Sequence, residues 1–178
     1  MKTYAMIDIE TTDITARTCI LSIGIVFFNI AALGKVIYVR PALQPQLDAG
    51  RRVSSDTLNF WMNQSTDAKK DAFSEDARVS INYTIGQLRE LDRADIILAN
   101  DPDLDIAGIV DFYTQFAEDN TIPLFDYKKK RCFRTIKRLY DPTRDLEPER
   151  TTHHNALDDA IVQAHYFLNI LEKYKLNI

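Results

Sequence analysis

The chain has 178 residues, 46% of them hydrophobic, and a formal net charge of −4. This length suits one domain, residues 1–178, that buries roughly 70% of the surface its unfolded chain exposes, so no stapling by disulfides or zinc is needed. The negative charge argues against a protein that holds nucleic acid by bulk positive charge. An enzyme with acidic metal ligands can nevertheless carry this charge and attract phosphate groups locally.

The two cysteines and the first residues of the chain indicate the cellular compartment of the protein. Cys19 and Cys132 are far apart and lack CxxC spacing, which is typical of reduced thiols in a cytosolic protein. The opening "MKTYAMIDIE" contains acids before an apolar signal segment could form, and no apolar run approaches the length of a membrane span. We therefore expect a soluble, cytoplasmic protein without membrane contact.

The first forty residues contain three β-rich runs. They are "TYAMIDIE", "CILSIGIVFFN" and "GKVIYVRP", and the short segment "IAALG" can join the second run to the third as a hairpin. The chain is therefore predicted to open with an antiparallel meander.

From residue 53 onward, helical patterns alternate with short apolar runs. The spacing of apolar residues predicts helices over 54–65, 78–94, 105–119, 131–140 and 155–174. "DIILAN" reads as a buried strand and "IPLFDY" as a short last strand. Three strands followed by alternating strands and helices predict an α/β fold, a mixed sheet flanked by helices.

The first predicted strand carries two acids on one face. Side chains alternate along a strand, so Asp8 and Glu10 point to the same side, roughly 7 Å apart. Two carboxylates at that spacing repel each other in a half-dry cleft but can hold cations between them. The alternative is a strand end that leaves the sheet, with both acids in water.

Two further acidic segments lie where elements meet. In "ILANDPDLDIAGI" a strand ends and a helix begins, and ligand sites are often built at such strand ends. Simple helix capping by an Asp is the alternative there. In "TTHHNALDDAIVQAHYF" a histidine pair precedes two adjacent acids at the start of the last helix. A histidine in that place can also be a cap or a core residue.

Together, "DIETT", "ILANDPDLDIAGI" and "HHNALDDA" resemble, in order and spacing, the three motifs of the DEDDh 3′→5′ exonucleases. "TLNFWMNQSTDAKKDAF" and "KKRCFRTIKRL" look more particularly like the small exoribonucleases of the Rv2179c type and the phage exonuclease A group. The resemblance extends over nearly the whole chain, 4–171. It implies a ribonuclease-H-like fold, a mixed five-stranded sheet flanked by helices with its first three strands antiparallel.

The resemblance also assigns site residues. The residues that match the family's four acids and its histidine are Asp8, Glu10, Asp105, Asp159 and His154. Because "ANDPDLD" carries more acids than family members often have, Asp103 stays an alternative to Asp105 as the third acid.

The last acid is a choice between two neighbours. The apolar stripe of the terminal helix and the four-residue spacing from His154 favour Asp158, whereas the family's spacing selects Asp159. The two arguments agree if His154 lies in the loop before the helix, where helical spacing does not apply. On that basis we expect Asp159 to be the ligand.

A DEDDh-like site implies two-metal chemistry. Two divalent ions roughly 4 Å apart can generate a hydroxide nucleophile and neutralise charge on the phosphate oxygens. Oxygen ligands alone suit Mg²⁺ or Mn²⁺, which Asp8 would bridge and the other acids would share. His154 would be the general base, and nucleoside 5′-monophosphates would leave from a single-stranded 3′ end. The alternatives are a non-catalytic or weakly active nucleic-acid-binding or regulatory protein on the same fold, and a metal-dependent phosphodiesterase for dinucleotides.

Four residues are candidates for substrate contact. Arg131 and Arg134 belong to the basic run "KKKRCFRTIKRL", which is either a phosphate track or a solvated face. Trp61, beside Phe60, could stack on a base or belong to the core. Thr11, directly after Glu10, is the fourth. The sequence does not choose between RNA and DNA, and the resemblance allows a homodimer.

Overall fold

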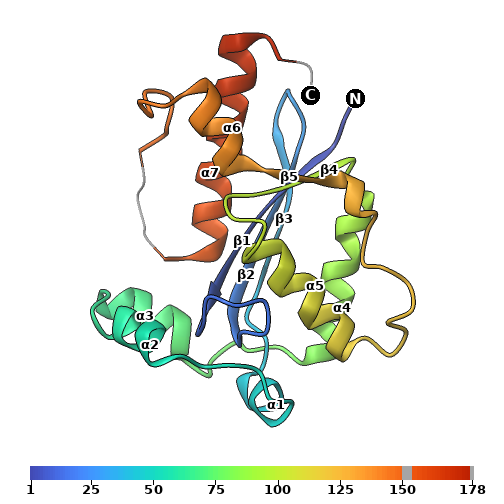
Figure 1. The fold of residues 1–178 in the computed structure, drawn as a ribbon, viewed down its shortest axis with the longest axis vertical. Helices are drawn as coiled ribbons and strands as arrows, with labels where there is room; N and C mark the ends of the chain where they lie inside the picture. The colour runs from blue at the N-terminus through green and yellow to red at the C-terminus, as the bar shows by residue number, and fades with distance from the viewer. Residues whose placement is uncertain (150–153, 177–178) are drawn as a thin grey trace.

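A computed structural model describes residues 1–149 and 154–176, and its centre is a mixed five-stranded sheet with helices on both faces (Figure 1). The strands are β1 (Tyr4–Thr11), β2 (Ile20–Phe28), β3 (Leu33–Val39), β4 (Ile96–Ala99) and β5 (Lys130–Cys132), in the order β3-β2-β1-β4-β5. The first three strands pair antiparallel, while β4 is parallel to β1 and β5 is parallel to β4. The predicted meander and mixed sheet are thus confirmed.

The last strand is not where the sequence placed it. "IPLFDY" forms no strand, and β5 lies in the basic run instead, at Lys130–Cys132. Leu124 and Phe125 are buried in the hydrophobic core without joining the sheet. An apolar run indicates burial, whereas an edge strand needs only backbone pairing, which exposed basic residues can provide.

Six of the seven helices in the described residues form three pairs around the sheet. In chain order they are α1 (Leu43–Asp48), α2 (Ser55–Met62), α3 (Thr66–Phe73), α4 (Ile81–Leu88), α5 (Asp105–Phe116), α6 (Phe133–Tyr140) and α7 (Ala156–Tyr174), with 3-10 turns at Arg89–Arg93 and Tyr127–Lys129. Helices α4 and α5 cover one face, α6 and α7 cover the other, and α2 with α3 lies beyond the end of β1 (Figure 1). Among the described residues, no helix combines the length and the apolar character needed to cross a membrane.

Strand alternation decides which face of the sheet carries the acids. Ala5, Ile7 and Ile9 of β1 belong to the core under α4 and α5. Tyr4 and Met6 belong to the core under α6 and α7. Asp8 and Glu10 continue the second series, so they lie on the side of α7, where the apolar core ends.

Candidate active site

Three carboxylates from two distant parts of the chain converge beside the sheet. Asp8 and Glu10 come from β1 and Asp159 from the first turns of α7, and one oxygen of each lies within 4.8 Å of the others. Asp159 is buried and the other two are half-buried. Three oxygen donors at this spacing match the preference of Mg²⁺ or Mn²⁺, and they include no nitrogen or sulfur ligand that would favour zinc.

A fourth carboxylate, Asp105, begins helix α5 and lies against β1. It is 5% exposed, and its Oδ1 accepts a hydrogen bond from the amide of Ile9 at 3.4 Å. Its Oδ2 accepts from the amide of Asp101 at 3.0 Å. Asp103, by contrast, is exposed. Of the two candidates for the third acid, the geometry supports Asp105.

The gathered acids raise one another's pKa values. Burial, together with the charges of Asp159 and Asp105, raises the pKa of Glu10 to about 8. Burial raises the pKa of Asp105 to about 7, although the amides that donate to it act in the opposite direction. Burial and the charge of Asp105 also hold the pKa of Asp8 well above its usual range. The ionised cluster is therefore costly by itself, and divalent cations would relieve the repulsion.

Gln163 supports the cluster from helix α7. Its Nε2 donates a hydrogen bond to Oδ1 of Asp8 at 2.7 Å, and the side chain is buried. Gln163 lies four residues after Asp159, hence on the same face of the helix. The sequence reasoning missed this residue, although its spacing from Asp159 was a usable signal.

The start of α7 is held by a polar network that the sequence reasoning also missed. Asn155 caps the helix, because its Oδ1 accepts from the amides of Leu157 and Asp158 at 3.0 and 3.1 Å. Its Nδ2 donates to Oδ2 of Asp71 on α3 at 3.0 Å, and the hydroxyl of Tyr38 on β3 donates to the same oxygen at 2.6 Å. The first turn of α7 is thereby fixed relative to both β3 and α3.

His154 directly precedes this cap and therefore lies outside the helix. Its backbone is left-handed, with φ of 63°, which is an uncommon and costly conformation for a residue with a side chain. Its ring meets the rings of Phe60 and Trp61 edge-to-face, with centroids 5.1 and 6.0 Å apart. The other histidine of the pair, His153, lies outside the described residues.

Trp61 and Thr11, both expected at the substrate, are placed in the interior. Trp61 is 2% exposed, and its indole Nε1 donates to the carbonyl of Thr11 at 2.8 Å. The Thr11 hydroxyl donates to the carbonyl of Asp13 at 2.8 Å. Stacking of a base on Trp61 does not fit this placement, because the ring faces are covered by protein. Phe60, at 44% exposed, is the accessible aromatic beside His154.

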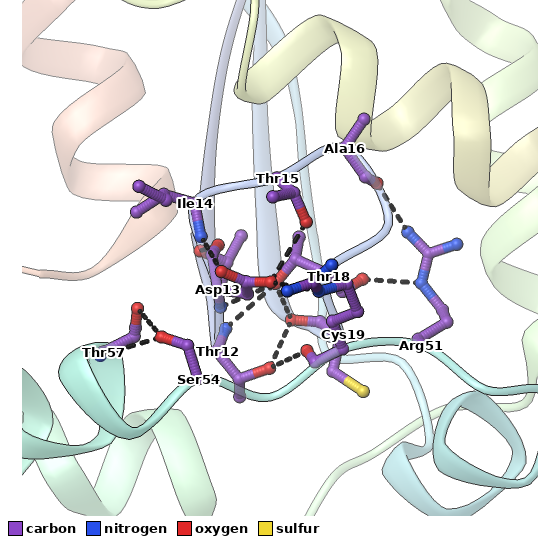
Figure 2. Close-up of polar contacts among 12 residues, drawn as sticks. Thr12, Asp13, Ile14, Thr15, Ala16, Thr18, Cys19, Arg51, Ser54 and Thr57 are labelled. Atoms are coloured by element: carbon purple, nitrogen blue, oxygen red, sulfur yellow. Dashed lines mark hydrogen bonds and ion pairs between the residues drawn. The ribbon is translucent and has the colours of Figure 1, made fainter.

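The loop after β1 connects the end of that strand to the start of helix α2 through hydrogen bonds (Figure 2). The Thr18 hydroxyl accepts hydrogen bonds from the amides of Thr12 and Asp13 at 3.2 and 2.8 Å. Thr12 in turn donates through its hydroxyl to the carbonyl of Arg52 and accepts from the amide of Ser54, the cap of α2. The end of β1 therefore sets where α2 presents Phe60.

The basic run lies beside the loop that carries the third acid. Arg131 and Arg134 line a pocket together with Asp101 and Asp103, between the β4–α5 loop and β5. Nη2 of Arg134 forms an ion pair with Oδ2 of Asp101 at 3.1 Å, and Arg131 is exposed. Both residues expected to contact phosphate thus lie beside the loop that leads to Asp105.

Residues 3–171 match the family described as the 3′-5′ exoribonuclease Rv2179c-like domain. The chain belongs to this family. No curated protein was found that matches this Rv2179c-like domain in sequence. The four acids that lie near one another come from the three segments that resemble the motifs of DEDDh exonucleases.

Solved structures share the fold of this Rv2179c-like domain. Exonuclease I of E. coli, in complex with a dT13 oligonucleotide, aligns with a TM-score of 0.62 and 10% identity over 97% of this chain and 41% of that chain. Exonuclease X, in complex with 5′ overhanging duplex DNA, aligns at 0.61 and 15% identity over 98% and 94%. Cell-death related nuclease 4 aligns at 0.56 and 12% identity over 97% and 64%. The domain thus spans about two fifths of exonuclease I, and the shared fold is ribonuclease-H-like.

Proposed function

We propose that this domain is a metal-dependent 3′→5′ exonuclease that hydrolyses single-stranded nucleic acid to nucleoside 5′-monophosphates. The observation that carries the proposal is the convergence of Asp8, Glu10 and Asp159 within 4.8 Å, with buried Asp105 against the same strand. Gathering four buried or half-buried carboxylates has no structural benefit, since each raises the charging cost of the others. Divalent cations bound between the carboxylates would offset this cost and explain why the acids lie together.

The acids would hold two divalent ions, Mg²⁺ or Mn²⁺. When bound, these ions would supply a nucleophile from water and neutralise charge on the phosphate oxygens. Asp8 is central to such a site, because it shares its face of β1 with Glu10 and its orientation is fixed by Gln163. Asp159 and Asp105 close the site from α7 and α5.

His154 is the candidate general base. It precedes the cap of α7 and so lies outside the helix, and its ring meets that of Phe60. An imidazole with a pKa near neutrality can accept the proton of the attacking water at physiological pH. Phe60 would stack on the terminal base, and Arg131 with Arg134 would contact the phosphates that follow.

The test is stepwise shortening of single strands labelled at the 5′ end, with RNA and DNA in parallel, and separate identification of the mononucleotides that are released. Mg²⁺ or Mn²⁺ should support stepwise shortening from the 3′ end, and a chelator should stop it. Asp8→Asn should fold and bind the strand but cleave neither substrate. A wild-type protein that binds both strands and shortens neither in the presence of either metal would instead be a non-catalytic binding protein. Whether the protein forms a homodimer is a separate prediction, open to measurement of its mass in solution.

A further inference from the structure

The chain's single tryptophan, Trp61, is buried on helix α2, yet it contacts two parts of the candidate active site. It belongs to a small core cluster with Leu21, Ala68 and Ala72, separate from the two cores that flank the sheet. Apolar packing explains why a large side chain occupies this position. It does not explain the N–H group, because a buried indole N–H needs a hydrogen-bond partner, whereas a phenyl ring needs none.

The indole N–H of Trp61 holds the end of strand β1. Its Nε1 donates to the carbonyl oxygen of Thr11 at 2.8 Å, and Thr11 directly follows Glu10. The amide of Ser54, the cap of α2, donates to the carbonyl oxygen of Thr12 at 2.8 Å. Helix α2 therefore holds the two successive carbonyls that follow Glu10. One of these hydrogen bonds comes from the backbone, while the other needs an indole.

Strand pairing is irregular at this point, so the sheet alone does not fix the backbone beside Glu10. The register between β1 and β2 shifts between Glu10 and Thr11. The amide of Ile20, which lies opposite Thr11, donates to Oε1 of Gln46 on α1 at 2.8 Å. An irregularity of this kind disrupts the ladder locally and changes the direction of side chains. A donor from outside the sheet, Nε1 of Trp61, therefore stabilises the strand end that carries Glu10.

The ring of Trp61 also contacts the candidate general base. The rings of Trp61 and His154 meet edge-to-face with their centroids 6.0 Å apart, and the ring of Phe60 meets both, at 5.6 and 5.1 Å. Edge-to-face pairs favour one relative orientation, because the positive edge of one ring is attracted to the negative face of the other. His154 lies before α7, where no helical backbone directs its side chain. These ring contacts therefore help to set where its imidazole lies.

We propose that Trp61 is a positioning residue, which holds the metal ligand Glu10 and the general base His154 in a fixed relation through one indole. This inference rests on the proposed function, because it takes Glu10 as a ligand and His154 as the base. The N–H group stabilises the strand end next to Glu10, and the ring supports His154. A shared support of this kind matters, since misplacing catalytic groups by roughly 1 Å can cost about 10²-fold in rate.

The first experiment separates the N–H group of Trp61 from its bulk. Trp61→Phe removes the donor to Thr11 and keeps an aromatic ring, whereas Phe73→Leu removes ring area from the same cluster but no donor. Mn²⁺ affinity is measured without substrate, by electron paramagnetic resonance of the free ion, at a temperature where both variants are folded. We expect Trp61→Phe to bind Mn²⁺ about fivefold more weakly, which is the size of effect of one buried hydrogen bond. Its kcat should fall by about tenfold, with the affinity for a single strand in chelator unchanged.

The control variant Phe73→Leu should lose stability only. Its Mn²⁺ affinity, and its kcat at equal folded fraction, should be those of the wild type. If Trp61→Phe and Phe73→Leu give the same Mn²⁺ affinity and the same kcat, Trp61 is only a core residue and the proposal is overturned.

The second experiment tests the ring. Neither Trp61→Phe nor Trp61→Met has the N–H group, so the ratio of their single-turnover rates reports on the ring alone, and methionine is flexible enough to fill the space. The ratio should be about tenfold in the wild-type background and close to one in the His154→Asn background, because effects that act through one residue are not additive. The same ratio in both backgrounds would show that the ring does not act through His154.

Failure of the proposed function has a different signature. The wild type would then bind Mn²⁺ and a single strand but shorten neither RNA nor DNA. The comparison of Mn²⁺ affinities needs no substrate, so it would still decide whether the N–H group of Trp61 supports the metal ligand Glu10.

Discussion

Gly24 lies opposite Asp8 in the β1–β2 pair and directly beneath Ala156, the first residue of helix α7. A Cβ atom at position 24 would stand 2.2 Å from the carbonyl oxygen of Ala156 and 2.5 Å from the amide nitrogen of Leu157. Because these are backbone atoms, no side-chain rotation can make room. The absence of a side chain on β2 therefore lets the first turn of α7, and with it Asp159, approach Asp8.

Gly24→Ala should displace the start of α7 and reduce nuclease turnover by at least about 10²-fold, the cost of misplacing catalytic groups by roughly 1 Å. Mn²⁺ affinity should fall with it, since Asp159 would move away from Asp8 and Glu10. The matched control is Gly86→Ala on α4, where an added Cβ meets nothing within 4 Å. That variant should keep full activity and gain roughly 0.5–1 kcal/mol of stability from helix propensity. Equal activity of the two variants would refute the role of Gly24.

The neighbours Asp158 and Asp159 should behave in opposite ways. Asp159 is buried within the acid cluster, so Asp159→Asn should nearly eliminate Mn²⁺-dependent hydrolysis. Asp158 is outside that cluster, and Asp158→Asn should mainly lose a helix-start charge worth about 0.3–1 kcal/mol. Turnover and the urea midpoint of unfolding, measured for both, separate the outcomes. An inactive Asp158→Asn beside a normal Asp159→Asn would reverse our assignment.

His154→Asn tests the general base with little change to the backbone. Asparagine tolerates the left-handed conformation that residue 154 adopts, but it cannot accept a proton near neutral pH. We expect kcat to fall by roughly 10² to 10⁴ with strand affinity unchanged. A matching loss in affinity and in rate would show that the histidine is structural.

Asn155 should matter for turnover beyond its value as a helix cap. Asn155→Ala removes both the cap of α7 and the hydrogen bond to Asp71. Ser80→Ala removes only the cap of α4, in which the Ser80 hydroxyl accepts from the amide of Tyr83. Each substitution should cost about 1 kcal/mol of stability. Only Asn155→Ala should also lower kcat, by about tenfold, because α7 then loses its link to α3. The decisive quantity is kcat measured at equal folded fraction. If Asn155→Ala and Ser80→Ala give the same kcat, the hydrogen bond from Asn155 to Asp71 does not contribute to turnover.

Without divalent ions, the fold should lose stability as the pH rises. The folded-state pKa values of Glu10 and Asp105, about 8 and about 7, lie above the roughly 4 expected for an unfolded chain. The folded protein therefore binds more protons than the unfolded one, and this contribution declines from about pH 5 through about pH 8. In chelator the urea midpoint should fall over that range, and Mg²⁺ should flatten the decline. A metal-free midpoint that rises with pH would show that other groups dominate.

Sequence periodicity determined the first three strands, the helix starting at Asp105 and the long final helix, because alternation and 3.6-residue spacing are local properties. The same local logic placed Asp8 and Glu10 on one face of β1, and family motif spacing pointed to Asp159. Prediction from local patterns failed at β5, where pairing with β4 outweighed the low strand propensity of Lys130 and Arg131. It also could not choose between substrate and core for Trp61, since burial depends on what packs above a ring.

Only the tertiary structure decided how the acids meet and what holds them. The sequence analysis assigned no role to Gly24, Asp71, Gln163 or Asn155, because their importance arises from contacts between residues far apart in the chain. Local patterns specify elements, whereas approach distances and charge clustering depend on how those elements pack.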